Sequence, residues 1–333
     1  MSVIQISVII PTHNQPAKLQ ETLAGLRQQT MPPANYEVIV VDDGSAPPVV
    51  LPEKLDGLRC VLLRLEGVER SAARNRGAML AQGELLIFLD DDMRVSSDFL
   101  SAHWRAHRQW PEALLVGSVR LPDEALKHPF GRFRQRLERQ GAPRQRGLTA
   151  QANFCTAANM AISRSRFEAL GGFNPALHSS EDQDFALRHT AGGGQIVYVP
   201  EADAVHRDDA LDIRRYCRRV EWGMQEMLPF CHRYPNWPDN VQRERVNGPV
   251  RWGREPVWHS ARKLIKAMLS RWPMIEGLFA VTWLLERSRP ESHFLDRMYR
   301  VLLGVHLFRG YRKGLKRYGV GPAPPPRFAQ TVE

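Results

Sequence analysis

The clearest candidates for a functional site in this sequence are three adjacent aspartates. Asp90-Asp91-Asp92 directly follows five uninterrupted apolar residues, Leu85 to Leu89. Alternate side chains of an extended chain point the same way, so Asp90 and Asp92 project to one side. Neighbouring carboxylates repel one another, and a hard divalent cation such as Mg²⁺ or Mn²⁺, which prefers oxygen ligands, would compensate their charge. The alternative is a solvated acidic turn.

A mostly parallel sheet is expected to position these acids. Short apolar runs alternate with segments that carry apolar residues at helical spacing. This order gives parallel strands joined by right-handed crossovers. The expected strands are Ile6–Ile10, Glu37–Val41, Cys60–Leu65 and Leu85–Leu89, and the expected helices are Lys18–Gln29 and Val68–Ala81.

Polar or acidic residues follow three of these strands, so the strand ends are expected to line one rim, where ligands of such sheets bind. Asp43 could accept hydrogen bonds from a nucleobase or a ribose, whereas Asp42 better suits stabilisation of the turn. The sequence lacks the glycine phosphate loops G-x-x-x-x-G-K-[ST] and G-x-G-x-x-G, which disfavours a P-loop NTPase or an NAD-binding domain. A metal together with Arg70, Arg74 and Arg76 would then hold phosphate charge, which suits a nucleotide-sugar pocket.

Charge is distributed unevenly along the 333 residues, which are enough for one large or two modest domains. The net charge is +10, but residues 1–209 hold 23 basic and 25 acidic residues, whereas residues 210–333 hold 23 and 11. The second part is therefore expected to face an anionic surface, with a merely soluble basic face as the alternative. The four cysteines are far apart and form no C-x-x-C pair, and no signal peptide is apparent, so a cytoplasmic protein is expected.

The C-terminal part is expected to be helical. Residues 257–269 have an apolar face opposite Arg262, Lys263 and Lys266, as in helices that lie in a membrane interface. Residues 272–285 are apolar but shorter than the ~20 residues that cross a bilayer. Residues 294–308 repeat the amphipathic pattern, 309–317 are cationic, and 320–333 are expected to be disordered. The alternative is that these helices pack on the catalytic domain or form a homodimer.

Several segments, in this order, resemble the family 2 glycosyltransferases. They are I-S-V-I-I-P-T-H-N at 6–14, E-V-I-V-V-D-D-G-S at 37–45, A-R-N-R-G at 73–77, G-E-L-L-I-F-L-D-D-D at 83–92, N-M-A-I-S-R-S-R-F-E-A-L-G-G-F at 159–173 and S-E-D-Q-D-F-A-L at 180–187. The resemblance implies a GT-A fold: a Rossmann-like α/β domain whose mostly parallel sheet is flanked by helices. It implies a catalytic domain over 1–209, with nucleotide-sugar binding in 1–95 and the acceptor side in 96–209. A basic helical extension over 210–333 would follow.

Roles for individual residues follow from the same resemblance. Asp182 matches the proposed catalytic base, although Glu181 and Asp182 could also be first-turn acids of a helix capped by Ser179 or Ser180. Asp92 and Asp90 match metal ligands, and His206 lies where relatives keep a histidine near the diphosphate or metal, with a structural histidine as the alternative. Glu181 and Asn159 are expected on the acceptor side. Donor contacts are expected from Pro11, Thr12, His13, Asp43, Arg74 and Asp91.

The expected function is an inverting, metal-dependent transfer of a sugar from a UDP-, GDP- or dTDP-linked donor to a hydroxyl of a glycan or lipid-linked acceptor. Family analogy suggests bacterial cell-envelope polysaccharide synthesis, at the inner face of the cell membrane. The alternatives are a basic nucleic-acid-binding protein and a scaffold built on a catalytically dead transferase domain. No nucleic-acid recognition motif supports the first, and the intact acids argue against the second.

Overall fold

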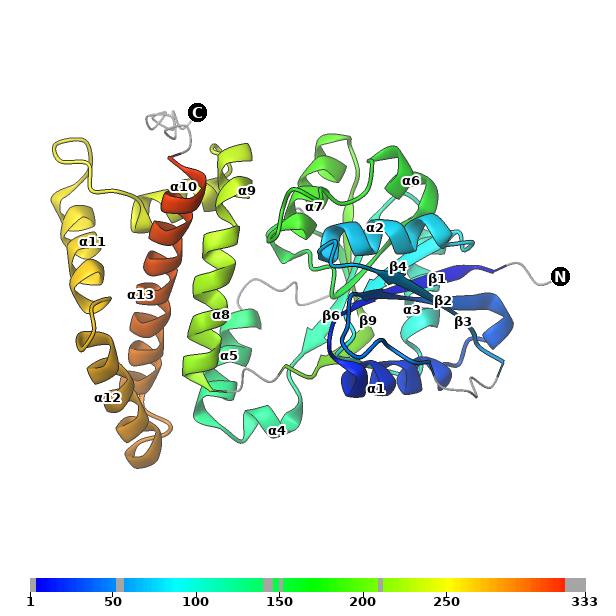
Figure 1. The fold of residues 1–333 in the computed structure, drawn as a ribbon, viewed down its shortest axis with the longest axis horizontal. Helices are drawn as coiled ribbons and strands as arrows, with labels where there is room; N and C mark the ends of the chain where they lie inside the picture. The colour runs from blue at the N-terminus through cyan, green and yellow to red at the C-terminus, as the bar shows by residue number, and fades with distance from the viewer. Residues whose placement is uncertain (1–3, 52–56, 140–145, 150–151, 209–211, 321–333) are drawn as a thin grey trace. The chain divides into compact units, whose positions relative to one another are not determined.

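The chain folds into two compact units (Figure 1). In this computed structural model the first unit comprises Met1–Leu126 and Arg134–Asp209, and the second comprises Lys127–Phe133 and Ala210–Glu333. The short segment joins the second unit because the rings of Phe130 and Phe133 pack on Tyr299. The structure describes residues 4–51, 57–139, 146–149, 152–208 and 212–320. The expectation of a disordered tail falls almost wholly on residues outside these ranges.

A mixed β-sheet forms the centre of the first unit, with strand order β3-β2-β1-β4-β8-β6-β9-β5 and with β7 paired to β9. Strands β3, β2, β1 and β4 are parallel, as the sequence predicts. Strand β8 is antiparallel to both β4 and β6, and β9 runs parallel to β6. The strands are β1 (Ile6–Thr12), β2 (Tyr36–Asp43), β3 (Arg59–Leu65), β4 (Leu85–Leu89), β5 (Met93–Val95), β6 (Leu114–Arg120), β7 (Gly147–Thr149), β8 (Asn159–Ser163) and β9 (Ile196–His206).

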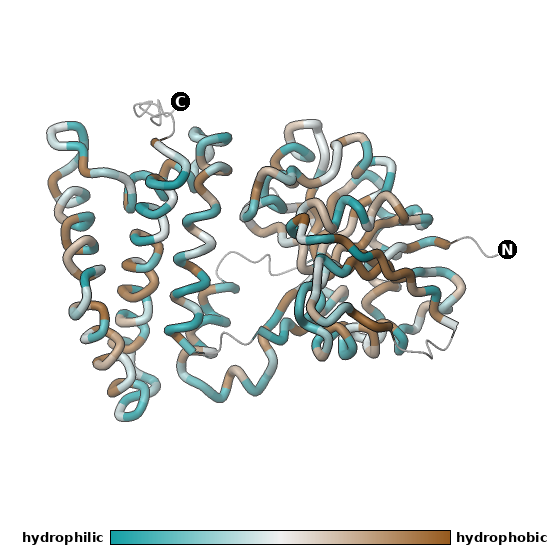
Figure 2. The backbone as a smooth tube through the Cα atoms, viewed as in Figure 1, coloured by the Kyte–Doolittle hydropathy of each residue, from teal (hydrophilic) through white to brown (hydrophobic). Residues whose placement is uncertain are grey.

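Helices cover both faces of this sheet. Every residue of β1 and β4 is buried, and Figure 2 shows hydrophobic stretches along the inner strands. Alternate side chains of β1 enter two cores: Val8 packs with α1 and α3, whereas Ile9 packs with α2, α6 and α7. These helices are α1 (Pro16–Arg27), α2 (Arg70–Leu80), α3 (Phe99–Gln109), α6 (Arg164–Ala169) and α7 (Glu181–Ala191), with 3-10 turns at Pro33–Asn35 and Ala152–Phe154. Helices α4 (Asp123–Leu126) and α5 (Pro129–Arg139) follow β6, and α5 begins in the segment that belongs to the second unit.

The strand directions bring the candidate residues to one edge of the sheet. The parallel strands β1, β2 and β4 end together, at Thr12, Asp43 and Leu89. Strand β9 runs in the same direction as β4, because two antiparallel pairings through β8 separate them. His206 at the end of β9 therefore lies at this edge, and its pairing with Met93 brings it beside Asp92. We call this edge the carboxylate rim.

The second unit is a bundle of helices built around the long helix α13. Its helices are α8 (Ile213–Glu226), α9 (Leu228–Arg233), α10 (Pro238–Asn247), α11 (Val257–Leu269), α12 (Met274–Ser288) and α13 (His293–Tyr318). Helix α13 packs closely on α8. The two helices are so near at Gly310 that a Cβ there would lie 2.2 Å from the backbone oxygen of Glu221. Glycine is required there by the close approach of the two helices.

Helix α11 has the bounds that the sequence predicts, but its apolar face points outward. Trp258 and Ile265 are exposed, whereas Lys263 is 3% exposed and donates hydrogen bonds to Glu255 and to the carbonyl of Pro249. Exposed apolar side chains continue on α12 at Trp283 and Leu284. Within the described residues, no helix is both long and apolar enough to cross a membrane.

Candidate active site

A buried arginine connects the two acidic segments of the first unit. Arg74, which is 2% exposed, donates from Nη2 to Asp90 Oδ1 and from Nη1 to Glu181 Oε1, both at 2.8 Å. Burial alone would raise the pKa of Asp90, but Arg74, Arg70 and His206 hold it below its usual range. The guanidinium therefore fixes the end of β4 against the start of α7, where Asp182 follows Glu181.

The middle acid of the rim, Asp91, is held by hydrogen bonds from β1 and α1. Thr12 Oγ1 donates to Asp91 Oδ2 at 2.5 Å, and Thr22 Oγ1 donates to the Asp91 carbonyl at 2.7 Å. Burial, and then the neighbouring Asp92 and Asp90, raise the pKa of Asp91 to about 7, although the Thr12 hydrogen bond opposes this. Pro11 and Thr12 are themselves buried in β1, so His13 is the exposed residue of this expected donor loop.

Asp92 and His206 face each other, as the β5–β9 pairing requires. His206 Nε2 lies 3.2 Å from Asp92 Oδ1, and Lys18 Nζ lies 3.8 Å from Asp92 Oδ2. Burial alone would lower the pKa of His206, but Asp92, Asp90 and Asp208 raise it above its usual value. The sequence did not predict that Lys18 lies at the rim. The only signal for this was its position early in α1, directly after the loop that follows β1.

The two acids at the end of β2 have different environments. The Asp42 carboxylate is 1% exposed and accepts from the backbone N–H groups of Ser45 and Val49 and from Arg64, which confirms the predicted turn-stabilising role. The Asp43 carboxylate lies nearer the surface. It accepts hydrogen bonds from the backbone N–H groups of Val68 and Glu69, the two residues that precede α2. Its remaining lone pairs can accept hydrogen bonds from a ligand.

Asp182 lies in the first turn of α7. Its Oδ1 accepts from the backbone N–H of Gln183 at 2.8 Å, and its Oδ2 accepts a longer bond of 3.4 Å from Ala157 N–H. Burial and then Glu181 raise the pKa of Asp182 to about 7, against the opposing effect of Arg74. A carboxyl group with this pKa can exchange a proton near neutral pH.

Backbone strain marks the loops around the rim. Outside glycine, positive φ angles occur in the described residues at Asn14 (55°), Glu69 (72°) and Ser180 (64°). They lie after β1, before α2 and before α7. Ser180 occupies the N-cap position of α7 but makes no side-chain cap hydrogen bond, so it does not cap the helix as the alternative interpretation expected, whereas Glu181 and Asp182 do lie in the first turn. Strain of this kind costs about 1–3 kcal/mol per residue and often occurs at functional sites.

The structure corrects the expectation for Asn159. This residue is fully buried; it donates to the carbonyls of Ser118 and Ala202 at 3.0 and 2.9 Å, and its Oδ1 accepts from His103 Nε2 at 2.9 Å. Burial lowers the pKa of His103 to about 4, so the ring is neutral. Asn159 therefore joins β8 to β6, β9 and α3 inside the core and does not face an acceptor.

The predicted metal ligands are only partly brought together. Within the described ranges, no group of three or more His, Cys, Asp or Glu side chains could hold a metal ion. Asp90 is instead engaged by Arg74 through Oδ1. Asp92 and His206 remain adjacent and partly exposed, and Mg²⁺ is commonly held by one or two carboxylates together with substrate phosphates. Asp92 and His206 therefore suit a cation whose remaining ligands are the oxygens of a bound diphosphate.

Residues 7–171, which include three of the rim strands, match a family described as glycosyl transferase family 2. These residues, about half of the chain, therefore belong to this family. An uncharacterized glycosyltransferase of Haemophilus influenzae is 32% identical over 186 residues, which are 55% of this chain and 61% of that protein. The pre-mycofactocin glycosyltransferase of Mycobacterium tuberculosis is 27% identical over 239 residues, 69% of this chain and 48% of that protein. The chain thus spans less than two thirds of the length of either relative.

Solved structures share the fold of this chain. The mannosyltransferase PcManGT from Pyrobaculum calidifontis, in complex with GDP-Man and Mn²⁺, has a TM-score of 0.61 and 18% identity, and the match covers 94% of this chain and 88% of that chain. The match to S. aureus TarS 1–349 in complex with UDP-GlcNAc has a TM-score of 0.51 and 16% identity, with 90% of each chain covered. These likenesses confirm the expected GT-A fold with a C-terminal helical part.

Proposed function

We propose that this chain is an inverting glycosyltransferase that moves a sugar from a nucleotide-diphospho-sugar to a hydroxyl of a glycan or lipid-linked acceptor. The single observation that carries the proposal is the Arg74 bridge between Asp90 and Glu181, because it joins the acids after β4 to the segment that holds Asp182. One acidic segment would act on the leaving group and the other on the acceptor. The nucleotide sugars bound by PcManGT and by TarS support a UDP- or GDP-linked donor.

Asp182 is proposed as the general base. In an inverting transfer the acceptor hydroxyl attacks the anomeric carbon from the face opposite the leaving nucleoside diphosphate, and a nearby carboxylate takes its proton. The raised pKa of Asp182, about 7, suits this transfer near neutral pH. A positioned base contributes ~10²–10⁴-fold in rate. Glu181 is paired with Arg74, so it would position Asp182 rather than receive the proton.

Asp92 and His206 are proposed to hold a divalent cation, Mn²⁺ or Mg²⁺, together with the donor diphosphate, and Asp91 would lie beside them. When bound, such an ion stabilises the charge that gathers on the leaving diphosphate. Asp43, together with Pro11, Thr12 and His13, is proposed to orient the nucleoside at the end of β1 and β2. The Mn²⁺ in the PcManGT complex supports metal use.

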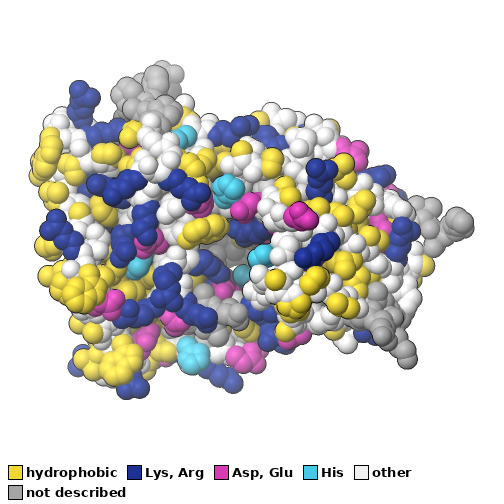
Figure 3. Space-filling view, viewed as in Figure 1, with side chains coloured by type: hydrophobic (Ala, Val, Ile, Leu, Met, Phe, Trp, Pro, Cys, Tyr) yellow, Lys and Arg dark blue, Asp and Glu magenta, His cyan; other side chains and the backbone are white. Residues whose placement is uncertain are grey.

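The helical unit is proposed to lie on the inner face of a membrane through α11 and α12. Val257 is 82% exposed and Trp258 60% exposed, and hydrophobic side chains gather over these helices at the left edge of Figure 3. The excess of basic residues after position 209 supports an anionic leaflet as the partner, since each cation near such a surface contributes ~1 kcal/mol. This surface would suit a lipid-linked acceptor.

Replacing both Trp258 and Ile265 by serine tests the membrane proposal in the full-length chain. Each buried apolar side chain is worth about 1.5–3 kcal/mol, so partition into phosphatidylglycerol vesicles should fall by at least about tenfold. Met79→Ser, on an exposed apolar residue of α2, is the control and should float as the parent does. Equal flotation of all three proteins, or a dimer dissociated by the double substitution, would show that this face does not bind lipid.

Incubation with nucleotide sugars and Mn²⁺ tests the transferase proposal. Release of nucleoside diphosphate is expected for one donor, and Asp182→Asn should lose most turnover while it still binds the nucleotide. Glu168→Gln, an exposed acid on α6, serves as the matched control with unchanged turnover. If Asp182→Asn turns over as the parent does, Asp182 is not the base.

A further inference from the structure

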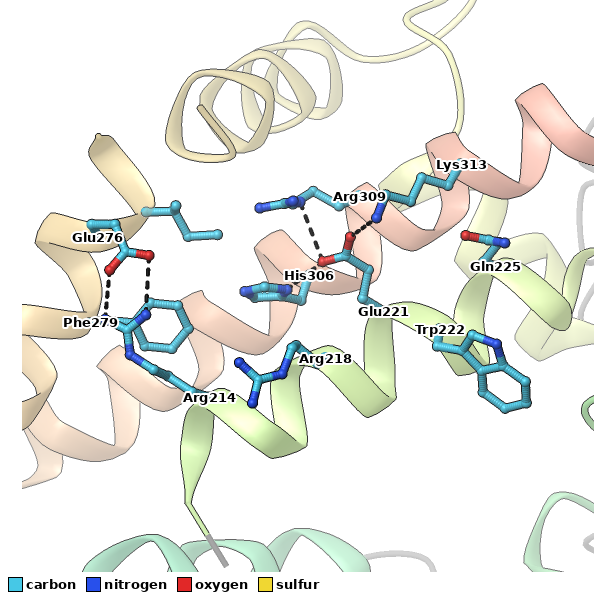
Figure 4. A pocket seen from close by; sticks show the side chains of 11 residues that line it. Arg214, Arg218, Glu221, Trp222, Gln225, Glu276, Phe279, His306, Arg309 and Lys313 are labelled. Carbon is cyan, nitrogen blue, oxygen red and sulfur yellow. Dashed lines mark hydrogen bonds and ion pairs between the residues drawn. The ribbon is translucent and has the colours of Figure 1, made fainter. Parts of the chain in front are cut away.

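A basic pocket lies within the helical unit, between α8, α12 and α13, with a volume of about 440 Å³ (Figure 4). Its lining includes four cations, Arg214, Arg218, Arg309 and Lys313. Two carboxylates, Glu221 and Glu276, oppose them, so the lining keeps an excess of positive charge. This volume lies in the range of small-molecule sites, ~300–1,000 Å³.

Three of the four cations are partly neutralised. Arg214 forms a bidentate pair with Glu276, at 3.1 and 2.6 Å. Glu221 receives Lys313 Nζ at 2.6 Å and Arg309 Nε at 3.3 Å. Lys313 and Arg309 each keep further N–H donors, because an ammonium has three and a guanidinium five. Arg218 is exposed and has no ion-pair partner among the described residues, and no dashed line reaches it in Figure 4.

His306 adds a buried polar atom without a partner. The residue is 5% exposed, and its Nδ1 lies 2.6 Å from Glu221 Oε2. Burial alone would raise the pKa of Glu221, but hydrogen bonds from His306 and Lys313 lower it to about 2, so Glu221 is ionised and Nδ1–H is the donor. His306 Nε2 is buried and makes no hydrogen bond within the described part of the chain. An unsatisfied buried nitrogen of this kind costs about 1–3 kcal/mol unless a ligand or water satisfies it.

We propose that this pocket binds a phosphoryl group, with Arg218, Arg309 and Lys313 on its anionic oxygens and His306 Nε2 sharing one proton with an oxygen. A tetrahedral phosphoryl group offers several oxygens to cations that arrive from two helices, whereas a carboxylate offers two in one plane. The proton lies on the ring if His306 is charged and on the phosphoryl oxygen if the ring is neutral. Trp222, which is 47% exposed, adds an apolar side chain to the lining of the pocket.

Two sources of a phosphoryl group fit the pocket. Helix α12 lines it with Glu276 and Phe279 and exposes Trp283 and Leu284 elsewhere on its surface, which favours the headgroup of a lipid. A small soluble phosphate or diphosphate has the same chemistry. Binding here does not require sugar transfer, so loss of donor turnover and loss of phosphoryl binding can be measured separately.

Titration calorimetry of the full-length protein with inorganic pyrophosphate, in chelator so that no divalent cation loads the carboxylate rim, tests the site. Arg218→Gln should weaken binding about tenfold, the effect of one charged hydrogen bond. Arg219→Gln removes a charge from the same helix outside the pocket, where Arg219 lies over the ring of Tyr216, and should change affinity by less than about twofold. His306→Gln is the second variant, with circular dichroism to verify its fold.

Vesicles distinguish the two sources. If Arg218→Gln weakens binding to phosphatidylglycerol vesicles but pyrophosphate does not bind, the site takes a lipid headgroup. If pyrophosphate alone depends on Arg218, the site takes a soluble phosphate. The proposal is overturned if neither probe binds, or if Arg218→Gln and Arg219→Gln weaken binding equally.

Discussion

Replacement of Arg74 by methionine tests the link between the two acidic segments. Methionine preserves much of the side-chain volume but leaves Asp90 and Glu181 without their shared cation. Breaking a buried ion pair costs about 3–5 kcal/mol, because the partner remains as an uncompensated charge. The Asp90 side chain is 26% exposed to solvent, so water screens part of its charge. We therefore expect the free energy of unfolding of the first unit to fall by about 3 kcal/mol, the lower end of this range.

Urea-dependent hydrogen exchange of peptides from α2 and α7 measures this loss in the first unit separately from the helical unit. A chelator keeps divalent cations from compensating the acids. Arg76→Met, an exposed position on the same helix, is the control and should stay within about 0.5 kcal/mol of the parent.

A double-mutant cycle with Glu181→Gln isolates the pair. Glu181→Gln alone should destabilise the first unit, but in the Arg74→Met background it should be neutral or stabilising, with a coupling energy of about 1–3 kcal/mol. A loss below about 1 kcal/mol in Arg74→Met, or additive effects of the two substitutions, would refute the reasoning.

Three further perturbations test other parts of the structure. Because Asp182 must be ionised to act as base and its pKa is raised to about 7, kcat/KM should fall about tenfold for each pH unit below pH 7; a profile flat to pH 5 would contradict its role. Gly310→Ala should destabilise the helical unit by about 1–3 kcal/mol in thermal unfolding, because its Cβ meets the backbone of Glu221, whereas Gly304→Ala, whose nearest neighbour would be 3.8 Å away, should not. Asn159→Ala should lower the thermal stability of the first unit by about 2–4 kcal/mol, since it leaves buried carbonyls without donors; an unchanged midpoint would show that water replaces the amide.

Local patterns predicted the elements well. Leu85–Leu89 and Val257–Leu269 have the bounds that the sequence indicates, because a continuous apolar run and a helical stripe are local signals. The sequence also indicated that Asp42 stabilises its own turn, a contact with residues only three and seven positions away.

Contacts between distant segments could not be predicted in this way. Arg74 and Glu181 are 107 positions apart, and nothing local to either residue selects its partner. Asn159 is the first residue of β8, where a polar residue usually lies at a rim, but its amide is satisfied inside the core. Helix α13 continues to Tyr318, past the predicted end at Phe308. Gly310 and Gly314 are poor helix formers by propensity, but at these positions α8 packs closely against α13, a tertiary contact that the local sequence does not reveal.

The most direct test of the central claim is nucleoside diphosphate release from a panel of nucleotide sugars, with Mn²⁺ or Mg²⁺, by the parent protein and by Asp92→Asn. The proposed function predicts release from at least one donor, loss of that release on chelation, and a fall of at least about 100-fold in Asp92→Asn with the fold retained. Release that persists in chelator and in Asp92→Asn, or no release from any donor, would contradict the claim that the carboxylate rim acts on a departing diphosphate.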